Sequence, residues 1–141
     1  MNQILIVYWS GTGNTAAMAE MVASGIREAG KEPVLIPAEE AAAEQLSSFQ
    51  AAAFGCPSMG DETLEESVME PFVEAAEKNV SGKTIGLFGS YGWGDGQWMR
   101  DWEERMKAAG AEIVGGEGVI CMEAPDDEAI AACEKLGSQL V

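Results

Sequence analysis

Residues 10–15 have the composition of an anion-binding turn. The segment consists of Ser10, Gly11, Thr12, Gly13, Asn14 and Thr15. Its glycines allow backbone N–H groups to turn inward, and the helical pattern that starts at Ala16 adds the partial positive charge of a helix N-terminus. Amides and hydroxyls could then hold an anion without help from Lys or Arg, neither of which occurs in or beside the segment.

Two other phosphate-binding patterns do not fit this segment. A P-loop requires Gly-Lys-Ser/Thr, and no lysine is present here. A dinucleotide-binding turn requires glycine where Ala16 stands and an acidic residue at the end of the second strand. The segment therefore predicts a site for one phosphomonoester, and the competing interpretation is an ordinary capped turn.

A second loop, Cys56 to Glu62, places an apolar side chain where an exposed one is expected. Pro57 and Gly60 predict a tight turn that includes Ser58, Met59 and Asp61. Met59 would then lie at the surface, available to cover a ligand. Cys56, at the end of an apolar run, is expected to be a small buried side chain.

A third loop, Ser90 to Gly96, holds two aromatic residues among three glycines: Tyr91 and Trp93 among Gly92, Gly94 and Gly96. Such spacing lets an indole lie flat on the surface, which suits stacking on a planar ligand. Trp98 and Trp102, four residues apart in a helical pattern, are expected to pack in the core. Together the three loops predict a site for a planar heterocycle with a phosphate tail.

Short apolar runs alternate with longer amphipathic stretches along the whole chain. The expected strands are Ile4 to Trp9, Val34 to Ile36, Ala51 to Cys56, Thr84 to Ser90, and a last one that begins at Ile113 and Val114 and resumes at Val119 to Cys121. The expected helices run from a cap at Asn14 or Thr15 to Ala29, and over Gln45 to Phe49, Leu64 to Glu77, Gln97 to Ala109 and Asp126 to Leu140. This alternation predicts one α/β domain over residues 1–141, a doubly wound sheet of five parallel strands. Ligands bind outside the carboxyl ends of such strands, so the three loops should converge.

The net charge of -16, from 24 acidic and 8 basic residues, restricts the partners. Nucleic acids and anionic membranes attract clustered Lys and Arg, so neither is expected, and a protein with a basic surface is favoured. The cysteines Cys56, Cys121 and Cys133 lack the paired spacing of a zinc site or a disulfide framework, and no signal peptide or membrane-spanning run is recognisable. We therefore expect a cytoplasmic protein without a bound metal.

Three segments of the chain resemble the flavodoxin family, in its short-chain form from anaerobic bacteria. They are YWSGTGNT (Tyr8 to Thr15), MGDE (Met59 to Glu62) and GSYGWGDG (Gly89 to Gly96). The resemblance covers essentially the whole chain and implies strand order 2-1-3-4-5 with FMN as cofactor.

The resemblance also implies that residues 10–15 hold the FMN phosphate, that Trp93 stacks on the outer face of the ring and that Met59 covers the inner face. Glu62 would accept a hydrogen bond from the pyrimidine ring, amides of Ser90 and Gly92 would bind the ring carbonyls, and Val119 to Pro125 would close one edge. The cofactor-binding set implied in this way is Ser10, Gly11, Thr12, Gly13, Asn14, Thr15, Ser58, Met59, Gly60, Asp61, Glu62, Ser90, Tyr91, Gly92, Trp93 and Gly94.

The resemblance further implies a monomeric, low-potential one-electron carrier that shuttles between redox proteins and has no substrate of its own. Carboxylates near an anionic reduced flavin would lower its potential, because like charges repel. One alternative is an FMN-dependent NAD(P)H or quinone reductase, which would need a nicotinamide or quinone pocket. The other is a phosphoacceptor signalling domain, which requires clustered acids after the first strand and Asp at the end of the third, where Ser10 and Cys56 stand.

Overall fold

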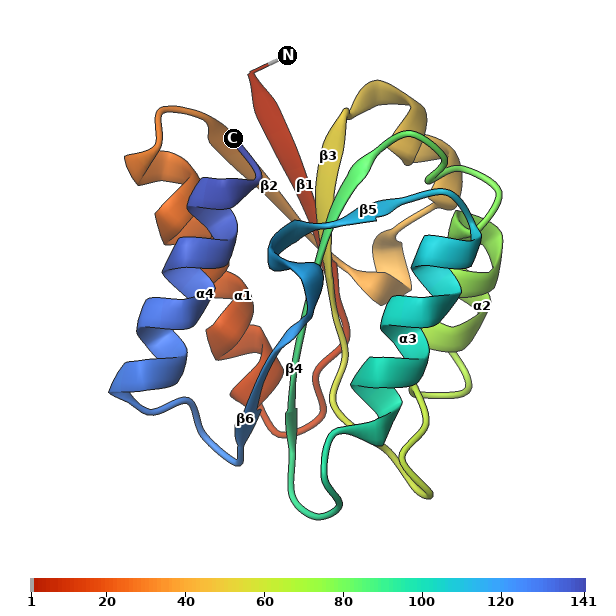
Figure 1. The fold of residues 1–141 in the computed structure, drawn as a ribbon, viewed down its shortest axis with the longest axis vertical. Coiled ribbons are helices and arrows are strands. Elements are labelled where there is room, and N and C mark those ends of the chain that lie inside the picture. Colours follow the sequence, from red (N-terminus) through yellow and green to blue (C-terminus); the bar gives the residue numbers. More distant parts are fainter. Residues whose placement is uncertain (1) are drawn as a thin grey trace.

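A parallel β-sheet forms the centre of the molecule (Figure 1). The computed structural model describes residues 2–141. Its strands are β1 (Gln3–Tyr8), β2 (Glu32–Pro37), β3 (Ala51–Gly55), β4 (Thr84–Tyr91), β5 (Glu112–Ile113) and β6 (Val119–Met122). Their order is β2-β1-β3-β4-β5, and β6 also pairs with β4. The doubly wound fold and the strand order are thereby confirmed.

The expected fifth strand is divided into two short strands along one edge of β4. β5 pairs with β4 at its start, where Thr84 lies opposite Glu112, and β6 pairs with its end, where Tyr91 lies opposite Met122. Between them lies the short 3-10 helix η3 (Val114–Gly116), which contains Gly115 at a φ of 73°. The interruption expected from the glycine-rich sequence after Val114 is confirmed.

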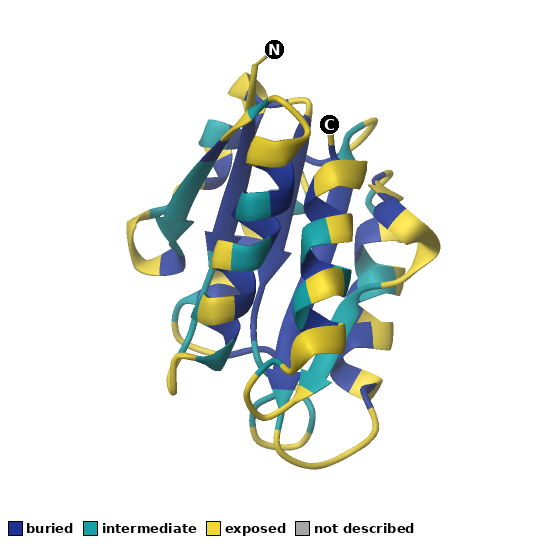
Figure 2. Cartoon of the chain, turned by 90° about the vertical axis from the view of Figure 1, so that its left-hand side faces the viewer, coloured by how far each residue is buried: buried dark blue, intermediate teal, exposed yellow. Residues whose placement is uncertain are grey.

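Two helices cover each face of the sheet. Helices α1 (Asn14–Glu28) and α4 (Asp127–Gln139) lie on one face, and α2 (Met69–Ala76) and α3 (Gln97–Ala108) lie on the other (Figure 1). Figure 2 shows that α1 and α4 turn buried residues toward the sheet and exposed residues toward solvent. The short 3-10 helices η1 (Ala38–Glu40) and η2 (Ala43–Ser48) follow β2.

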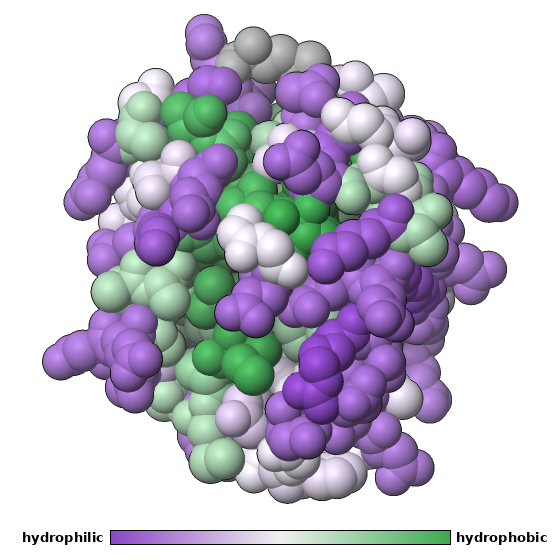
Figure 3. Space-filling view, in the orientation of Figure 1, coloured by the Kyte–Doolittle hydropathy of each residue, from purple (hydrophilic) through white to green (hydrophobic). Residues whose placement is uncertain are grey.

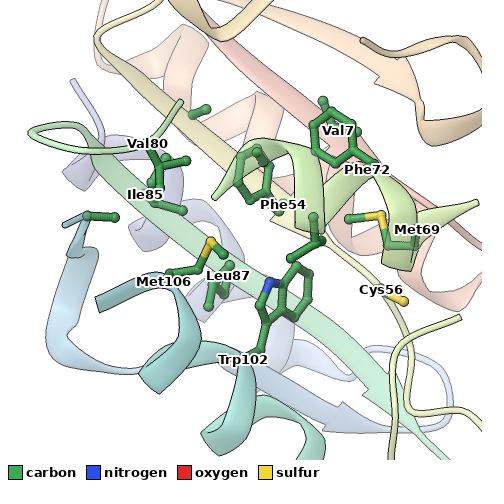
Figure 4. Close-up of a cluster of buried hydrophobic side chains, with 14 of the residues drawn as sticks. Val7, Phe54, Cys56, Met69, Phe72, Val80, Ile85, Leu87, Trp102 and Met106 are labelled. Carbon is green, nitrogen blue, oxygen red and sulfur yellow. The ribbon is translucent and has the colours of Figure 1, made fainter. Parts of the chain in front are cut away.

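A hydrophobic core fills each of the two layers. The larger one lies between the sheet and α2 and α3, and includes Phe54, Leu87 and Trp102 (Figure 4). Trp98 belongs to the same cluster, and Trp98 and Trp102 are each 1% exposed. The smaller one lies against α1 and α4. The expected burial of the two tryptophans is confirmed.

Three helix boundaries differ from the sequence-based expectation. Helix α1 is capped by Gly13 in a left-handed conformation, with a φ of 99°, and not by Asn14 or Thr15. The segment expected as a helix over Gln45 to Phe49 is the 3-10 helix η2, which begins at Ala43. Helix α2 begins at Met69 and not at Leu64, because the carboxylate of Glu65 accepts the N–H groups of Val68 and Met69 in a turn that precedes the helix.

The surface is mostly hydrophilic. Figure 3 shows polar side chains over most of one face, with hydrophobic side chains exposed along its centre, where β5 and β6 lie in Figure 1. Met122, at the end of β6, is among the large hydrophobic residues that are exposed. No helix within residues 2–141 is both long enough and apolar enough to cross a membrane.

Candidate functional site

The three loops meet at the carboxyl ends of the strands, at the lower end of the molecule in Figure 1. They enclose an open cavity of about 270 Å³. Its lining consists of Trp9, Gly11, Thr12, Asn14, Pro57, Ser58, Met59, Ser90, Tyr91, Gly92 and Glu123. The convergence predicted from the sequence is confirmed.

The first loop presents a set of unpaired backbone donors to one end of this cavity. The N–H groups of Gly11, Thr12, Asn14 and Thr15 donate to no acceptor within residues 2–141. The hydroxyl oxygen of Ser10 accepts the two neighbouring N–H groups, from Gly13 at 3.1 Å and Ala16 at 3.2 Å. Because these donors lie at the N-terminus of a 15-residue helix, they favour a negatively charged group.

Thr15 connects the first loop to the third inside the protein. Its side chain is 1% exposed, and its hydroxyl lies 3.5 Å from that of Ser90. The backbone N–H of Ser90 also donates to the Thr15 hydroxyl at 3.4 Å. The structure therefore places the buried Thr15 against Ser90, which lines the cavity, and these contacts connect the first loop to the third.

The second loop contributes a buried hydroxyl without a partner. Ser58 lines the cavity, while its Oγ is inaccessible to solvent and makes no hydrogen bond within the described residues. The Ser58 backbone N–H donates to Ser90 O at 3.0 Å, which holds the loop in place. Since an unpaired buried polar atom is costly, Ser58 Oγ indicates a polar ligand atom at this position.

After Ser58 the chain forms a narrow turn. The backbones of Met59 and Thr63 exchange two hydrogen bonds of 2.8 Å, and Gly60 and Asp61 lie at the exposed tip. Gly60 has a φ of 49°, and a Cβ there would meet no atom within 4 Å. Glycine is therefore favoured here by backbone conformation and not by lack of space.

Glu62 lies at the same turn but does not line the cavity. Its Oε1 accepts hydrogen bonds from the backbone N–H groups of Gly96, at 3.1 Å, and Gln97, at 3.0 Å, at the start of α3. Its carboxylate also packs against Gly94, where a Cβ would be 2.6 Å from Glu62 Cδ. The Oε2 atom accepts no hydrogen bond within residues 2–141 and remains available as an acceptor.

The remaining predicted residues lie around the rim. Trp93 is 58% exposed at the tip of the third loop and outside the cavity lining. Gly60, Asp61 and Gly94 are also exposed and do not line the cavity. The structure thus brings Gly11, Thr12 and Asn14 of the first loop together with Ser58, Met59 and residues 90–92. Ser10, Gly13, Thr15 and the exposed Trp93 do not line the cavity.

Three lining residues were missing from the set predicted by sequence: Trp9, Pro57 and Glu123. Trp9 packs against the first loop, where a Cβ at Gly11 would lie 3.2 Å from the indole. Trp9 and Pro57 directly adjoin predicted residues, so neighbourhood alone could have included them. Glu123 lies in the segment Val119 to Pro125, which the resemblance implied would close one edge of the ring.

Two ionisable groups behind the second loop have shifted pKa values. Burial raises the pKa of the Cys56 thiol to about 12, so the cysteine is a protonated core residue, as expected. Burial also acts to raise the pKa of Glu65, but the Ser67 hydroxyl and the N–H groups of residues 67–69 outweigh it and lower that pKa to about 2. Neither group lines the cavity, and within residues 2–141 no cluster of acidic or cysteine side chains could hold a metal ion.

Comparison with known proteins agrees with this geometry. The family model described as Flavodoxin matches residues 6–136. A flavodoxin from Clostridium beijerinckii is 47% identical over 135 residues, which is 96% of each chain. One from Megasphaera elsdenii is 42% identical over 132 residues, covering 94% of this chain and 93% of the relative. The solution structure of the two-electron reduced M. elsdenii flavodoxin superimposes with a TM-score of 0.87 at 40% identity and covers 97% of each chain. The chain belongs to the flavodoxin family.

Proposed function

We propose that this chain carries single electrons on a non-covalently bound FMN held in the cavity between the three loops. Membership of the flavodoxin family makes it an FMN-binding electron carrier that serves redox partners, and not an enzyme. When bound, FMN supplies the redox chemistry by accepting and releasing electrons at low potential. The observation that supports this site most strongly is the cavity itself, which combines unpaired helix N-terminal amides with the orphaned Ser58 hydroxyl.

The proposed phosphate site is the first loop. Ser10, Gly11, Thr12, Gly13, Asn14 and Thr15 would surround one anion with hydroxyls and N–H groups. Among the described residues, no cationic side chain lines the cavity. Hydrogen bonds to a charged acceptor are about twice as strong as those between neutral groups. A phosphate monoester can therefore be held without an ion pair.

The proposed ring site lies between the second and third loops. Met59 lines the cavity and would cover the inner face of the ring, while the exposed Trp93 would close over the outer face. Ser90, Tyr91, Gly92 and Gly94 would present amides to one edge of the ring. Gly60, Asp61 and Oε2 of Glu62 would meet its polar atoms.

The partners are proposed to be redox proteins with basic docking surfaces. The net charge of -16 supports this, because complementary charge accelerates association between proteins. The same repulsion between copies supports a monomer made of one FMN-binding domain, residues 1–141. A cytoplasmic location is proposed from the sequence alone.

An absorption spectrum of the purified protein, reconstituted with FMN, tests this function. We expect a flavin spectrum, tight one-to-one binding and reversible titration by chemical reductants in two one-electron stages. Addition of NADH or NADPH alone should leave the spectrum unchanged. Turnover of either nucleotide would instead support the reductase alternative, and failure to bind FMN would reject the proposed function.

A further inference from the structure

The indole of Trp98 links helix α3 to the first residue of the second loop. Its Nε1–H donates a hydrogen bond of 3.1 Å to the carbonyl oxygen of Cys56, and both residues are buried. Cys56 directly follows β3 and precedes Pro57, which lines the cavity. Trp98 itself does not line the cavity. Any influence of Trp98 on a ligand there therefore passes through the residues that the indole contacts.

The carbonyl group of Cys56 is held in a confined position. It packs against Gly89 of β4, where an added Cβ would be only 2.1 Å from the carbonyl oxygen. The backbone N–H of Cys56 donates to Phe88 O at 3.1 Å, which ties the same residue to β4. Within residues 2–141 Trp98 supplies the one hydrogen bond that the Cys56 oxygen accepts. Because an unpaired buried carbonyl is costly, this indole N–H stabilises the start of the second loop.

The same indole also contacts the third loop. Its ring centroid lies 5.6 Å from that of Tyr91, at an interplanar angle of 51°. Tyr91 lines the cavity, and the neighbouring Ser90 accepts the N–H of Ser58 in the second loop at 3.0 Å. Trp98 therefore hydrogen-bonds to one of the two loops that border the proposed ring site and packs against the other.

Trp102 offers a comparison one turn further along α3. Trp98 and Trp102 are each 1% exposed and belong to the same core cluster. The Nε1 of Trp102, however, makes no hydrogen bond within the described residues. The two indoles thus fill similar volumes in one core, and only that of Trp98 uses its N–H to hold a loop.

We propose that Trp98 is a positioning residue for the flavin ring, which holds the second loop in its binding conformation through the carbonyl of Cys56. The inference rests on the proposed function and extends it. A loop that is already ordered loses less conformational freedom when a ligand binds, so the affinity is higher. The residues positioned in this way are Pro57, Ser58 and Met59, which follow Cys56 and line the cavity. Trp98 makes no hydrogen bond to the first loop within residues 2–141, so the proposed phosphate site is independent of it.

The test is titration of the Trp98→Phe apoprotein with FMN and, separately, with riboflavin. Phenylalanine keeps an aromatic ring in the core and removes the N–H. We expect both flavins to bind about fivefold more weakly, a factor typical of one lost hydrogen bond. The ratio of the two affinities should stay unchanged, because the phosphate site is unaltered. Circular dichroism establishes that the variant is folded, and a purely structural role would then leave both affinities unchanged.

Trp102→Phe is the matched control. It makes the same substitution in the same helix and core, but it removes an N–H that has no partner within the described residues. Both flavin affinities should therefore remain those of the unmodified protein. Benzothienylalanine at residue 98 gives a second variant, because it replaces the indole N–H with sulfur and nearly preserves the shape of the side chain. It should weaken binding of both flavins as Trp98→Phe does.

Equal weakening of FMN and riboflavin binding, confined to the two variants at residue 98, supports the inference. Unchanged affinities in these variants, or the same weakening in Trp102→Phe, would overturn the positioning role while leaving FMN binding intact. A loss confined to FMN would also overturn it, because the effect would then lie at the phosphate site. Absence of FMN binding to the unmodified protein would instead reject the proposed function itself.

Discussion

The carboxylate of Glu62 accepts a hydrogen bond from the backbone N–H of Gln97 at 3.0 Å. Glu62 belongs to the second loop, whereas Gln97 is the first residue of α3, directly after the third loop. The same oxygen also accepts the N–H of Gly96. One side chain therefore caps a helix and fixes the distance between the two loops that border the proposed ring site.

Removing the Glu62 carboxylate should lower the free energy of unfolding. It should also lower FMN affinity, because Glu62 fixes the distance between the two loops that border the proposed ring site. Loss of a helix cap costs about 0.5 to 2 kcal/mol, so Glu62→Ala should reduce the free energy of unfolding of the apoprotein by roughly 1 kcal/mol. Glu62→Gln retains a carbonyl acceptor and should lose less. Denaturant unfolding of both variants measures the difference, and identical stabilities would show that the contact with α3 contributes nothing.

Gly60 should control the first reduction potential. FMN held here would need an additional carbonyl acceptor at one ring nitrogen after taking up one electron and one proton, and the resemblance to flavodoxins implies that the peptide between Gly60 and Asp61 supplies it by reorienting. A turn with this carbonyl toward the ring can require a positive φ, which glycine adopts at little cost and other residues resist by roughly 1 to 2 kcal/mol. Gly60→Thr should therefore lower the first potential by tens of millivolts, measured by redox titration.

Gly82→Thr is a suitable control for this prediction. Gly82 has a φ of 77° and equally free space around a Cβ, but it precedes β4 at the other end of the sheet. Its substitution should cost stability without changing either potential. If Gly60→Thr leaves the gap between the two potentials unchanged, the peptide reorientation is not the stabilising step.

Trp93 should contribute to binding by stacking. Its indole is 58% exposed, which leaves one face free for the ring. Aromatic stacking is worth about 1 kcal/mol beyond buried area, so Trp93→Ala should weaken FMN binding at least fivefold and relieve quenching of flavin fluorescence. The FMN affinity of the Trp93→Phe variant should lie between those of the unmodified protein and the Trp93→Ala variant. Unchanged affinity and fluorescence in the alanine variant would place Trp93 away from the ring.

Glu65 should make folding sensitive to acid. Its pKa is lowered from 4.5 to about 2 by folding, so the ionised carboxylate stabilises the protein above about pH 4.5, and this contribution is lost as the pH falls toward 2. Hydrogen bonds to a charged group are worth on the order of 1.5 to 3 kcal/mol, and Glu65 is 7% exposed. Glu65→Gln should lower the free energy of unfolding at pH 6 and flatten its decline with acid.

The neighbouring Glu66→Gln provides the comparison, because Glu66 is exposed. Denaturant unfolding at pH 6, 4 and 3 would separate the two variants. A slope with pH that is the same in Glu65→Gln as in the unmodified protein would assign the acid sensitivity to other groups.

The sequence could predict the fold and the convergence of the loops because both depend on strong local patterns. A continuous apolar run such as that of β1 indicates a strand covered on both faces, and glycine-rich turns mark the ends of strands. Parallel topology then places all the carboxyl ends at one edge. Predicting the fold and the convergence of the loops therefore required no knowledge of contacts between residues far apart in the sequence.

The features that the sequence did not predict correctly depend on contacts between particular residues. The helical pattern from Leu64 onward looks continuous in the sequence. The carboxylate of Glu65 accepts the N–H groups of Val68 and Met69 in a turn, however, and α2 begins only at Met69. Asn14 and Thr15 are good capping residues, yet Gly13 takes the left-handed conformation before the helix. Glu123 reaches the cavity only because β6 pairs with β4 and brings it beside Tyr91.

Titration of the apoprotein with FMN and, separately, with riboflavin tests the proposed phosphate site. The free amides and hydroxyls at the start of α1 are proposed to hold the phosphate, and hydrogen bonds to a charged group are worth about 1.5 to 3 kcal/mol each. Two such bonds predict that FMN binds at least about a hundredfold more tightly than riboflavin, and that Thr12→Ala weakens FMN binding but not riboflavin binding. Equal affinities for the two flavins would contradict the assignment.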